Sequence, residues 1–254
     1  MYRAVADEPH GTFHFEMGRH LAERLGYPPA ELDRVPAEAI ESFAGVGYHF
    51  GLAAIAPGEC VVDLGSGSGM DAFLAGNHAG SDGGVAGVDM TDEQLTKARR
   101  LAARDGYTNV RFDKGYIEET PVADGWADVV ISNGVINLCD DKTAVFREIA
   151  RILKPGGRLA ISDIVTEHQL TEAIVCDVNL WASCIGGAMQ QDDYRRAIED
   201  ARLELHAMQE NPEYEFISDS AQGATKTFGV KSISILATKP SSTTETPRTQ
   251  TERA

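Results

Sequence analysis

Apolar runs and apolar stripes at helical spacing alternate along the middle of the chain. Short apolar runs predict five strands, at residues 60–62, 85–88, 110–112, 127–132 and 159–162. Between these runs, apolar residues recur every three or four positions, as in helices that pack against a sheet. Strand and helix alternate five times, so the pattern predicts an α/β fold with a doubly wound, mostly parallel sheet and helices on both faces.

The two ends of the chain differ from this alternating middle. Residues 13–50 contain helix formers interrupted by prolines, which predicts two or three short helices. Near the other end, residues 203–208 and 232–237 predict two more strands, which makes a seven-stranded sheet. The residues after Lys239 lack apolar side chains. We therefore expect an N-terminal helical cap or lid at 1–50, a main domain at 51–240 and a disordered tail at 241–254.

Local signals place several helix ends. Thr91 is followed three residues later by Gln94, which is the capping-box pattern. Gly106 is a suitable C-terminal end for the helix that begins after Thr91. Asp140 or Asp141 can cap the next helix, and the segment 154–157 ends it.

Three glycines at alternate positions follow the first predicted strand. Gly65, Gly67 and Gly69 allow positive φ and let a ligand lie against the backbone, and the next helix offers free N–H donors. The turn therefore favours a nucleotide-like ligand. A dinucleotide fingerprint would need a glycine where the chain has Met70, and no tyrosine is followed by a lysine four residues later. Hydride transfer is thus disfavoured.

Polar residues follow the carboxyl ends of the other predicted strands. These residues are Asp89, Glu118, Asn133 and Asp163. Ligands of doubly wound sheets bind beyond the carboxyl ends of the strands, so one crevice can collect these side chains.

Several motifs in this order resemble the class I S-adenosylmethionine-dependent methyltransferases. They are Val-Asp-Leu-Gly-Ser-Gly-Ser-Gly at 62–69, the acid Asp89, and Leu-Lys-Pro-Gly-Gly-Arg-Leu at 153–159. The resemblance covers about residues 51–240 and implies the Rossmann-like methyltransferase fold with S-adenosyl-L-methionine as cofactor.

The resemblance also implies a role for each matching residue. Asp63 would lie near the cofactor's ammonium group, Asp89 would accept both ribose hydroxyls, and Asn133 would lie beside the methionine moiety. Met90 would pack on the adenine, which Ile117 and Glu118 would flank. The expected cofactor-binding set is Asp63, Gly65, Gly67, Gly69, Asp89, Met90, Ile117, Glu118 and Asn133.

Three further segments, 87–91, 130–138 and 180–188, resemble the arsenite methyltransferases in particular. That family holds trivalent arsenic by cysteine thiolates, and Cys184 stands at one of these positions. The other two positions carry Gly134 and Val46. Cys139 and Cys176 are the remaining candidates for a thiolate set, and we expect both to be buried apolar thiols.

The acceptor of the methyl group is less constrained than the donor. A thiolate or arsenic acceptor needs no base from the protein, whereas a hydroxyl acceptor does. Cys184 and His49 are the two residues expected to act in catalysis. Arsenite is one acceptor that the resemblance allows. The alternatives are O-, N- or C-methylation of a small metabolite, with 43–50 and 213–228 as a lid, and a non-catalytic cofactor-binding protein.

Composition narrows the partners. The formal net charge is −16, which disfavours nucleic acid and anionic membranes as partners and leaves a small-molecule acceptor. The four cysteines show no C-x-x-C pair, so they are expected to be reduced, and no metal site is expected. An acidic N-terminus without an apolar run predicts a cytoplasmic protein.

Overall fold

A computed structural model describes residues 16–175 and 185–241 of the chain, and its central feature is one mixed sheet. The strands run in the order β3-β2-β1-β4-β5-β8-β7, and the short β6 pairs with β5 beside this path. Their bounds are β1 Cys60–Leu64, β2 Gly84–Asp89, β3 Val110–Lys114, β4 Ala127–Asn133, β5 Leu153–Thr166, β6 Met189–Gln190, β7 Glu204–Glu210 and β8 Lys231–Thr238. The predicted seven-stranded, doubly wound sheet is confirmed, and β6 is an addition to it.

One strand of the sheet, β8, runs opposite to its neighbours. The pairs from β3 to β5 are parallel, whereas β8 runs antiparallel to both β5 and β7. The strand β5 is much longer than the predicted 159–162, because it pairs with β4 on one side and with β8 on the other. The first switch in strand order lies between β1 and β4, which is where ligands bind in such sheets.

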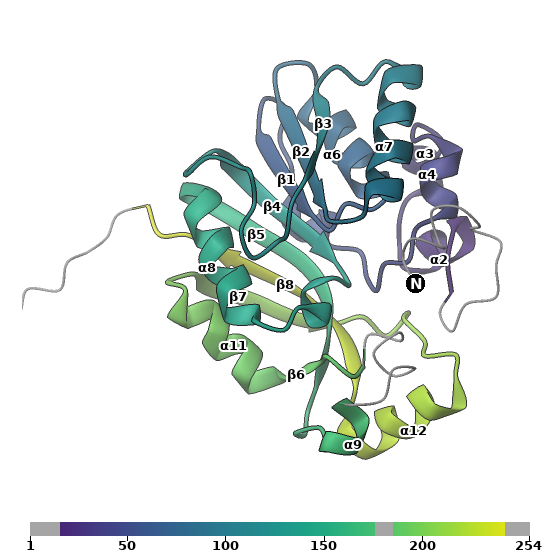
Figure 1. The fold of residues 1–254 in the computed structure, drawn as a ribbon, viewed down its shortest axis with the longest axis vertical. Coiled ribbons are helices and arrows are strands. Elements are labelled where there is room, and N and C mark those ends of the chain that lie inside the picture. Colours follow the sequence, from purple (N-terminus) through teal and green to yellow (C-terminus); the bar gives the residue numbers. More distant parts are fainter. Residues whose placement is uncertain (1–15, 176–184, 242–254) are drawn as a thin grey trace, which may run out of the picture.

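The helices cover both faces of the sheet (Figure 1). On one face, α6 (Met70–Ala79) and α7 (Asp92–Asp105) pack with Val61 of β1 in one hydrophobic cluster. On the other face, α8 (Lys142–Ile152) and α11 (Gln191–Asp200) pack with Val62 of the same strand. Successive residues of β1 thus point to opposite faces, and both faces are buried as in other parallel sheets.

The N-terminal segment forms short helices that lie against α6 and α7 (Figure 1). They are α2 Arg19–Arg24, α3 Pro29–Leu32, α4 Ala37–Glu41 and α5 Phe50–Ala53. Leu21, Tyr27 and Leu32 are almost fully buried and belong to the same hydrophobic cluster as Phe73 of α6. The predicted cap therefore shares the core of the sheet domain, and we call residues 16–50 the cap.

A smaller group of elements lies below the sheet in Figure 1. It contains α9 (Glu172–Val175), α12 (Asp219–Phe228) and β6, and its apolar cluster includes Ile164, Leu170 and Ile185. Val46 of the cap belongs to this cluster as well. The predicted tail at 241–254 lies almost wholly outside the described residues.

Most of the predicted helix ends agree with the structure. Asp141 caps α8, because its Oδ1 accepts a hydrogen bond from the Ala144 N–H at 2.9 Å. Gly106 ends α7 in the left-handed conformation. Thr91 is the N-cap of α7, but its side chain makes no capping hydrogen bond, so the predicted capping box is wrong in that respect. None of the described helices has the length and apolar character needed to cross a bilayer.

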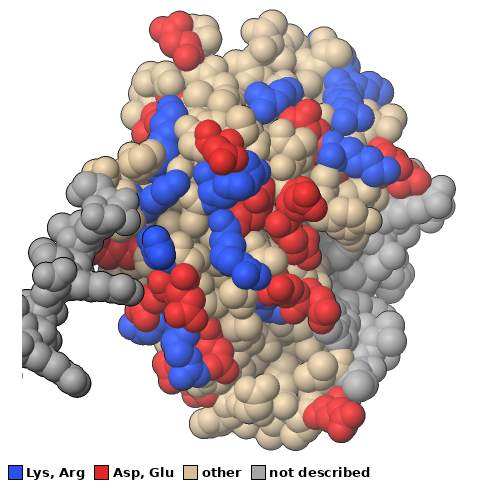
Figure 2. Space-filling view, turned by 60° about the vertical axis from the view of Figure 1, so that its left-hand side comes forward, with Lys and Arg blue, Asp and Glu red and all other residues tan. Residues whose placement is uncertain are grey.

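Acidic and basic side chains are intermixed on the face of the molecule shown in Figure 2. In the molecule as a whole, oppositely charged side chains form ion pairs such as Arg151–Glu148 and Lys154–Asp128. The expectation that the protein has no nucleic-acid partner stays a prediction.

Candidate functional site

A cavity of about 630 Å³ opens where β1, β2 and β4 end. Its walls are the glycine turn 65–69, the ends of these strands, the segment 115–118, the turn after β4 and the cap residues Phe43, Ala44 and Gly45. This is the crevice that the strand order predicts for a ligand. All nine residues of the expected cofactor-binding set line it.

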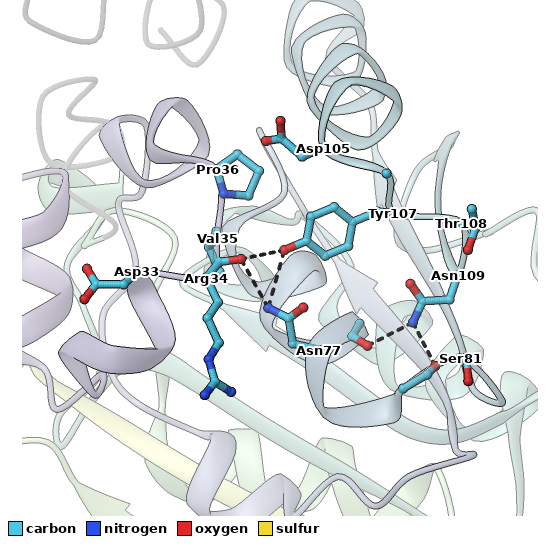
Figure 3. A pocket seen from close by; sticks show the side chains of 13 residues that line it. Asp33, Arg34, Val35, Pro36, Asn77, Ser81, Asp105, Tyr107, Thr108 and Asn109 are labelled. Atoms are coloured by element: carbon cyan, nitrogen blue, oxygen red, sulfur yellow. Dashed lines mark hydrogen bonds between the residues drawn. The ribbon is translucent and has the colours of Figure 1, made fainter.

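A second hollow, of about 580 Å³, lies at the opposite edge of the sheet, where β2 and β3 begin (Figure 3). Several of its polar groups form hydrogen bonds within the protein. The Tyr107 hydroxyl donates to the Arg34 carbonyl at 2.8 Å, and the Asn109 amide donates to the Gly76 carbonyl at 2.9 Å. The first contact joins the cap to the sheet domain, so this hollow is a seam between them and the first cavity is the candidate site.

The glycine turn needs glycine for two different reasons. Gly65 has φ +76°, and a Cβ built there would lie 2.4 Å from Cγ2 of Val135, so backbone conformation and close packing both exclude a side chain. At Gly67, φ is +52°, but the nearest atom to a built Cβ is 3.9 Å away, so the space above this residue is open. The turn therefore leaves room for a ligand against its backbone, as the sequence predicts.

Two buried carboxylates form the floor of the cavity beside this turn. Asp63, at the end of β1, is 3% exposed, and its Oδ2 has no hydrogen-bond partner. Burial, together with the charges of Asp71 and Asp89, raises the pKa of Asp63 well above its usual value. Burial also raises the pKa of Asp71 to about 6. An unpaired buried carboxylate is costly, so this floor is suited to a cationic group that brings hydrogen-bond donors.

Asp89 fastens the glycine turn to the end of β2. Its Oδ2 accepts from the Gly67 N–H at 2.9 Å, and its Oδ1 accepts from the Thr91 N–H at 2.8 Å. The second bond occupies the N–H at the start of α7. Each carboxylate oxygen has a further lone pair, so Asp89 can still accept from ligand hydroxyls. Its expected role toward a ribose stays a prediction.

The rim of the cavity exposes large apolar side chains. Met90 is 60% exposed and Tyr116 is 68% exposed, and both line the cavity. Ile117 next to Tyr116 is buried, and Glu118 follows at the wall. Exposed apolar side chains beside a cavity indicate a surface that a ligand covers, which agrees with the expected adenine position.

Asn133 connects the end of β4 to the cap. Its Oδ1 accepts from the Val46 N–H at 2.7 Å, and its Nδ2 donates to the Gly47 carbonyl at 3.0 Å. The same Nδ2 lies 3.0 Å from the hydroxyl oxygen of Tyr27. Asn133 therefore holds the cap loop over the cavity, in addition to lining the expected methionine position.

Of the two residues expected to act in catalysis, only His49 lies within the described residues. His49 is fully buried, is not among the lining residues, and stacks on Phe50 with ring centroids 5.0 Å apart. Desolvation lowers the pKa of His49 to about 3. The structure therefore buries the ring of His49 in the cap and leaves it out of the cavity lining, where a residue that acts in catalysis is expected. Cys184 and Cys176 lie outside the described residues.

The two remaining arsenic-ligand positions of the resemblance lie side by side but carry no sulfur. A Cβ built at Gly134 would lie 3.1 Å from Cγ1 of Val46, which is 1% exposed. Cys139 lines the cavity, but burial and then the charge of Glu118 raise its pKa to about 12, so it remains a neutral thiol. Among the residues that the structure describes, no group of three His, Cys, Asp or Glu could hold a metal ion.

Two residues of the site were not predicted from the sequence. The first is Asp71, which lies two residues after Gly69 in the first turn of α6. Tyr27 donates its hydroxyl to Asp71 Oδ1 at 2.8 Å across 44 residues of sequence. No local pattern signals such a contact, although the position of Asp71 at the first turn of α6 could have identified it as a cavity residue.

Comparisons with known proteins agree with this geometry. Residues 55–202 match the family model described as a methyltransferase domain. An arsenite methyltransferase from Halobacterium salinarum is 42% identical over 199 residues, which cover 78% of this chain and 51% of that protein. The arsenite methyltransferase of Homo sapiens is 41% identical over 138 residues, or 51% of this chain and 37% of that one. The chain thus spans about half, or less, of the length of these relatives.

Solved structures give the same result for the fold. The crystal structure of an arsenic(III) S-adenosylmethionine methyltransferase from Chlamydomonas reinhardtii matches with a TM-score of 0.65 and 29% identity, over 89% of this chain and 74% of that one. The geranyl diphosphate C-methyltransferase of Streptomyces coelicolor matches with a TM-score of 0.67 over 94% and 97% of the two chains. At 20% identity this second match concerns the fold alone.

Proposed function

Because the chain belongs to the class I S-adenosylmethionine-dependent methyltransferases, close to the arsenite methyltransferases, we propose that it methylates a small molecule. We propose further that this acceptor is a molecule other than arsenite and is not held by cysteine thiolates. The observation that carries the donor half of this proposal is the buried, unpartnered Oδ2 of Asp63 at the end of β1. The cofactor's ammonium group supplies the donors that this oxygen lacks.

The other lining residues fit the rest of the cofactor. Asp89 accepts the ribose hydroxyls, and the open face of Gly67 admits the ligand against the turn. Met90, Ile117 and Glu118 line the same cavity and would hold the adenine, with Glu118 able to accept from its amino group. When bound, S-adenosylmethionine supplies an electrophilic methyl group on a sulfonium. The protein then has to align the acceptor with that methyl group and exclude water, and the cap loop held by Asn133 closes the cavity for this purpose.

The acceptor half of the proposal rests on Val46 and Gly134. Trivalent arsenic is a soft centre that requires several thiolates, and these two neighbouring positions offer none. Cys139 does not replace them, because its raised pKa keeps the thiol protonated. We therefore favour an oxygen, nitrogen or carbon nucleophile of a small metabolite over arsenite. The cytoplasmic location expected from the sequence is part of this proposal.

The experiment is release of S-adenosylhomocysteine by the purified chain with a panel of small acceptors. Arsenite with glutathione is one member of the panel, and Asp63→Asn serves as the donor-site control. We expect release with a carbon, oxygen or nitrogen acceptor and only background release with arsenite. Arsenite methylation that Cys184→Ser abolishes would overturn the acceptor assignment. Tight cofactor binding without release for any acceptor would instead favour a binding protein.

A further inference from the structure

A chain of hydrogen bonds links the cap to the floor of the candidate site. The Tyr27 hydroxyl donates to Asp71 Oδ1 at 2.8 Å, and it accepts from Asn133 Nδ2 at 3.0 Å. Asn133 Nδ2 is also 3.3 Å from Asp71 Oδ2. Asp71 and Asn133 both line the cavity, whereas Tyr27 does not. One cap hydroxyl thus orients two side chains that face the ligand.

Packing fixes the ring that carries this hydroxyl. Tyr27 is 1% exposed, and it makes edge contacts with Phe43, Tyr48 and Phe50 at centroid distances of 5.2, 4.9 and 6.0 Å. A ring held on three sides has little freedom to turn. The hydroxyl therefore reaches Asp71 as a preorganised donor rather than as one position of a mobile side chain.

Among the residues that the structure describes, no lysine or arginine acts on the pKa of Asp71. Asp63 of β1 adds a second buried carboxyl, whose pKa is raised by burial and then by the charge of Asp71. From the cap side, His49 Nε2 is 4.0 Å from Asp71 Oδ2, but burial keeps that imidazole neutral. Burial, and then the charges of Glu31 and Asp71, raise the pKa of the nearby Tyr48 phenol. The donors Tyr27 and Asn133 lower the pKa of Asp71 against the opposing effect of burial.

We propose that Tyr27 is a positioning residue for the methyl donor, which holds Asp71 ionised and oriented together with Asn133 so that the cap contributes to cofactor affinity without touching the cofactor. This inference rests on the proposed function, because it assumes that the cationic end of S-adenosylmethionine lies on the Asp63 and Asp71 floor.

The proposal has a pH signature. A cation binds more tightly to an ionised Asp71, so cofactor affinity rises as the pH increases through the pKa of this carboxyl, about 6. Removing the Tyr27 hydroxyl removes a donor that favours the carboxylate. The pKa of Asp71 then rises, and the increase in affinity moves to higher pH. A loss of packing alone would not move this midpoint.

The test compares Tyr27→Phe with Tyr107→Phe by titration calorimetry with S-adenosylmethionine from pH 5.5 to 8.5. Both variants remove one hydroxyl that bonds across the seam between cap and sheet domain, but the Tyr107 hydroxyl bonds to the Arg34 carbonyl at the opposite edge of the sheet (Figure 3). We expect Tyr27→Phe to bind about tenfold more weakly at pH 7.5, with its affinity midpoint at higher pH. Tyr107→Phe should bind as wild type does.

A double-mutant cycle separates positioning from folding. In an Asp71→Asn background, Tyr27→Phe should change the affinity less than twofold, because the group it positions is already neutral. Equal affinity and an equal midpoint for Tyr27→Phe and wild type would overturn the inference. So would the same loss in both tyrosine variants, or an undiminished loss in the Asp71→Asn background. Failure of the wild type to bind would overturn the proposed function itself, and this inference with it.

Discussion

The part of the cavity that we assign to the methyl donor differs in character from the part that we assign to the acceptor. We call the glycine turn with Asp63 and Asp89 the donor half, and the region beyond Asn133, near Gly134 and Val46, the acceptor half. The donor half is polar: its glycine turn leaves open space above Gly67, and Asp63 is buried without a hydrogen-bond partner for its Oδ2. Beyond Asn133, the acceptor half is apolar, and Val46 there belongs to a hydrophobic cluster with Ile164 and Ile185. A site for a charged cofactor contains buried polar groups that destabilise the protein until the cofactor binds. An apolar wall has no such unpaired groups. The donor half therefore identifies the reaction, and the acceptor half can change without disturbing the fold.

The largest expected effect separates ligand binding from stability at the donor half. Asp63→Asn should weaken S-adenosylmethionine binding about 300-fold, because losing one member of a buried charge pair costs about 3–5 kcal/mol. The same substitution should stabilise the protein without ligand by about 1–2 kcal/mol, because the unpaired buried carboxylate is removed. Titration calorimetry and urea denaturation measure the two effects. The matched control is Asp113→Asn, on β3 and outside the cavity. A loss of stability together with affinity would contradict the role assigned to Asp63.

The next prediction concerns two substitutions that introduce a dithiol into the acceptor half. The double variant Val46→Cys and Gly134→Cys places two thiols side by side, and it should bind the dithiol-specific reagent phenylarsine oxide about 100-fold more tightly than wild type, by chelation. The measurement is a competition titration in a phosphine reductant, and the double alanine variant is the control. Cofactor affinity should stay within about threefold, although the positive φ of Gly134 will cost about 1 kcal/mol of stability. Equally tight arsenical binding by wild type would show that other thiols already form a site.

A smaller effect tests whether His49 belongs to the cap core rather than to the acceptor half. The folded protein keeps His49 neutral down to a pKa of about 3, whereas the unfolded chain takes up a proton near pH 6.5. Burial of His49 therefore leaves the free energy of unfolding unchanged above pH 6.5. Below pH 6.5 it lowers the free energy of unfolding by about 1.4 kcal/mol per pH unit. When the pH is lowered from 7.5 to 5.5, the free energy of unfolding of His49→Leu should rise relative to that of wild type by about 1 kcal/mol, measured by urea denaturation. His20→Leu, at an exposed site, should show no such trend. A constant difference between His49→Leu and wild type would contradict this burial.

The smallest effect concerns the helix behind the acceptor half. Asp141→Ala removes the N-cap of α8 and should cost about 1 kcal/mol of stability, whereas Asp141→Asn should retain most of it. Cofactor affinity should remain within about twofold of the wild-type value in both variants, because Asp141 and its N-cap hydrogen bond lie outside the cavity. Thermal denaturation and calorimetry give the two numbers. A large loss of affinity would mean that the two halves of the cavity are not independent.

The sequence predicted the donor half better than the rest, and the reason is locality. The glycine turn, Asp63 and Asp89 are fixed by their position after apolar runs, so periodicity and strand ends were sufficient to place them. The capping box failed because the Asp89 carboxylate accepts from the Thr91 N–H at the start of α7, the donor that the Gln94 side chain was expected to bond. Gln94 Oε1 accepts from the Ser68 hydroxyl instead. The burial of His49 and the contact of Tyr27 with Asp71 depend on how the cap packs against α6, which no local pattern encodes. The length of β5 likewise depends on pairing with β8, about 70 residues later in the chain.

The most direct measurement of the central claim is a calorimetric titration of the wild-type chain with S-adenosylmethionine at pH 7.5. The donor half built by Asp63, the glycine turn and Asp89 predicts saturable binding of one cofactor per chain with micromolar affinity, and strong weakening in Asp63→Asn. No heat of binding at millimolar cofactor, or equal binding by Asp63→Asn, would contradict it.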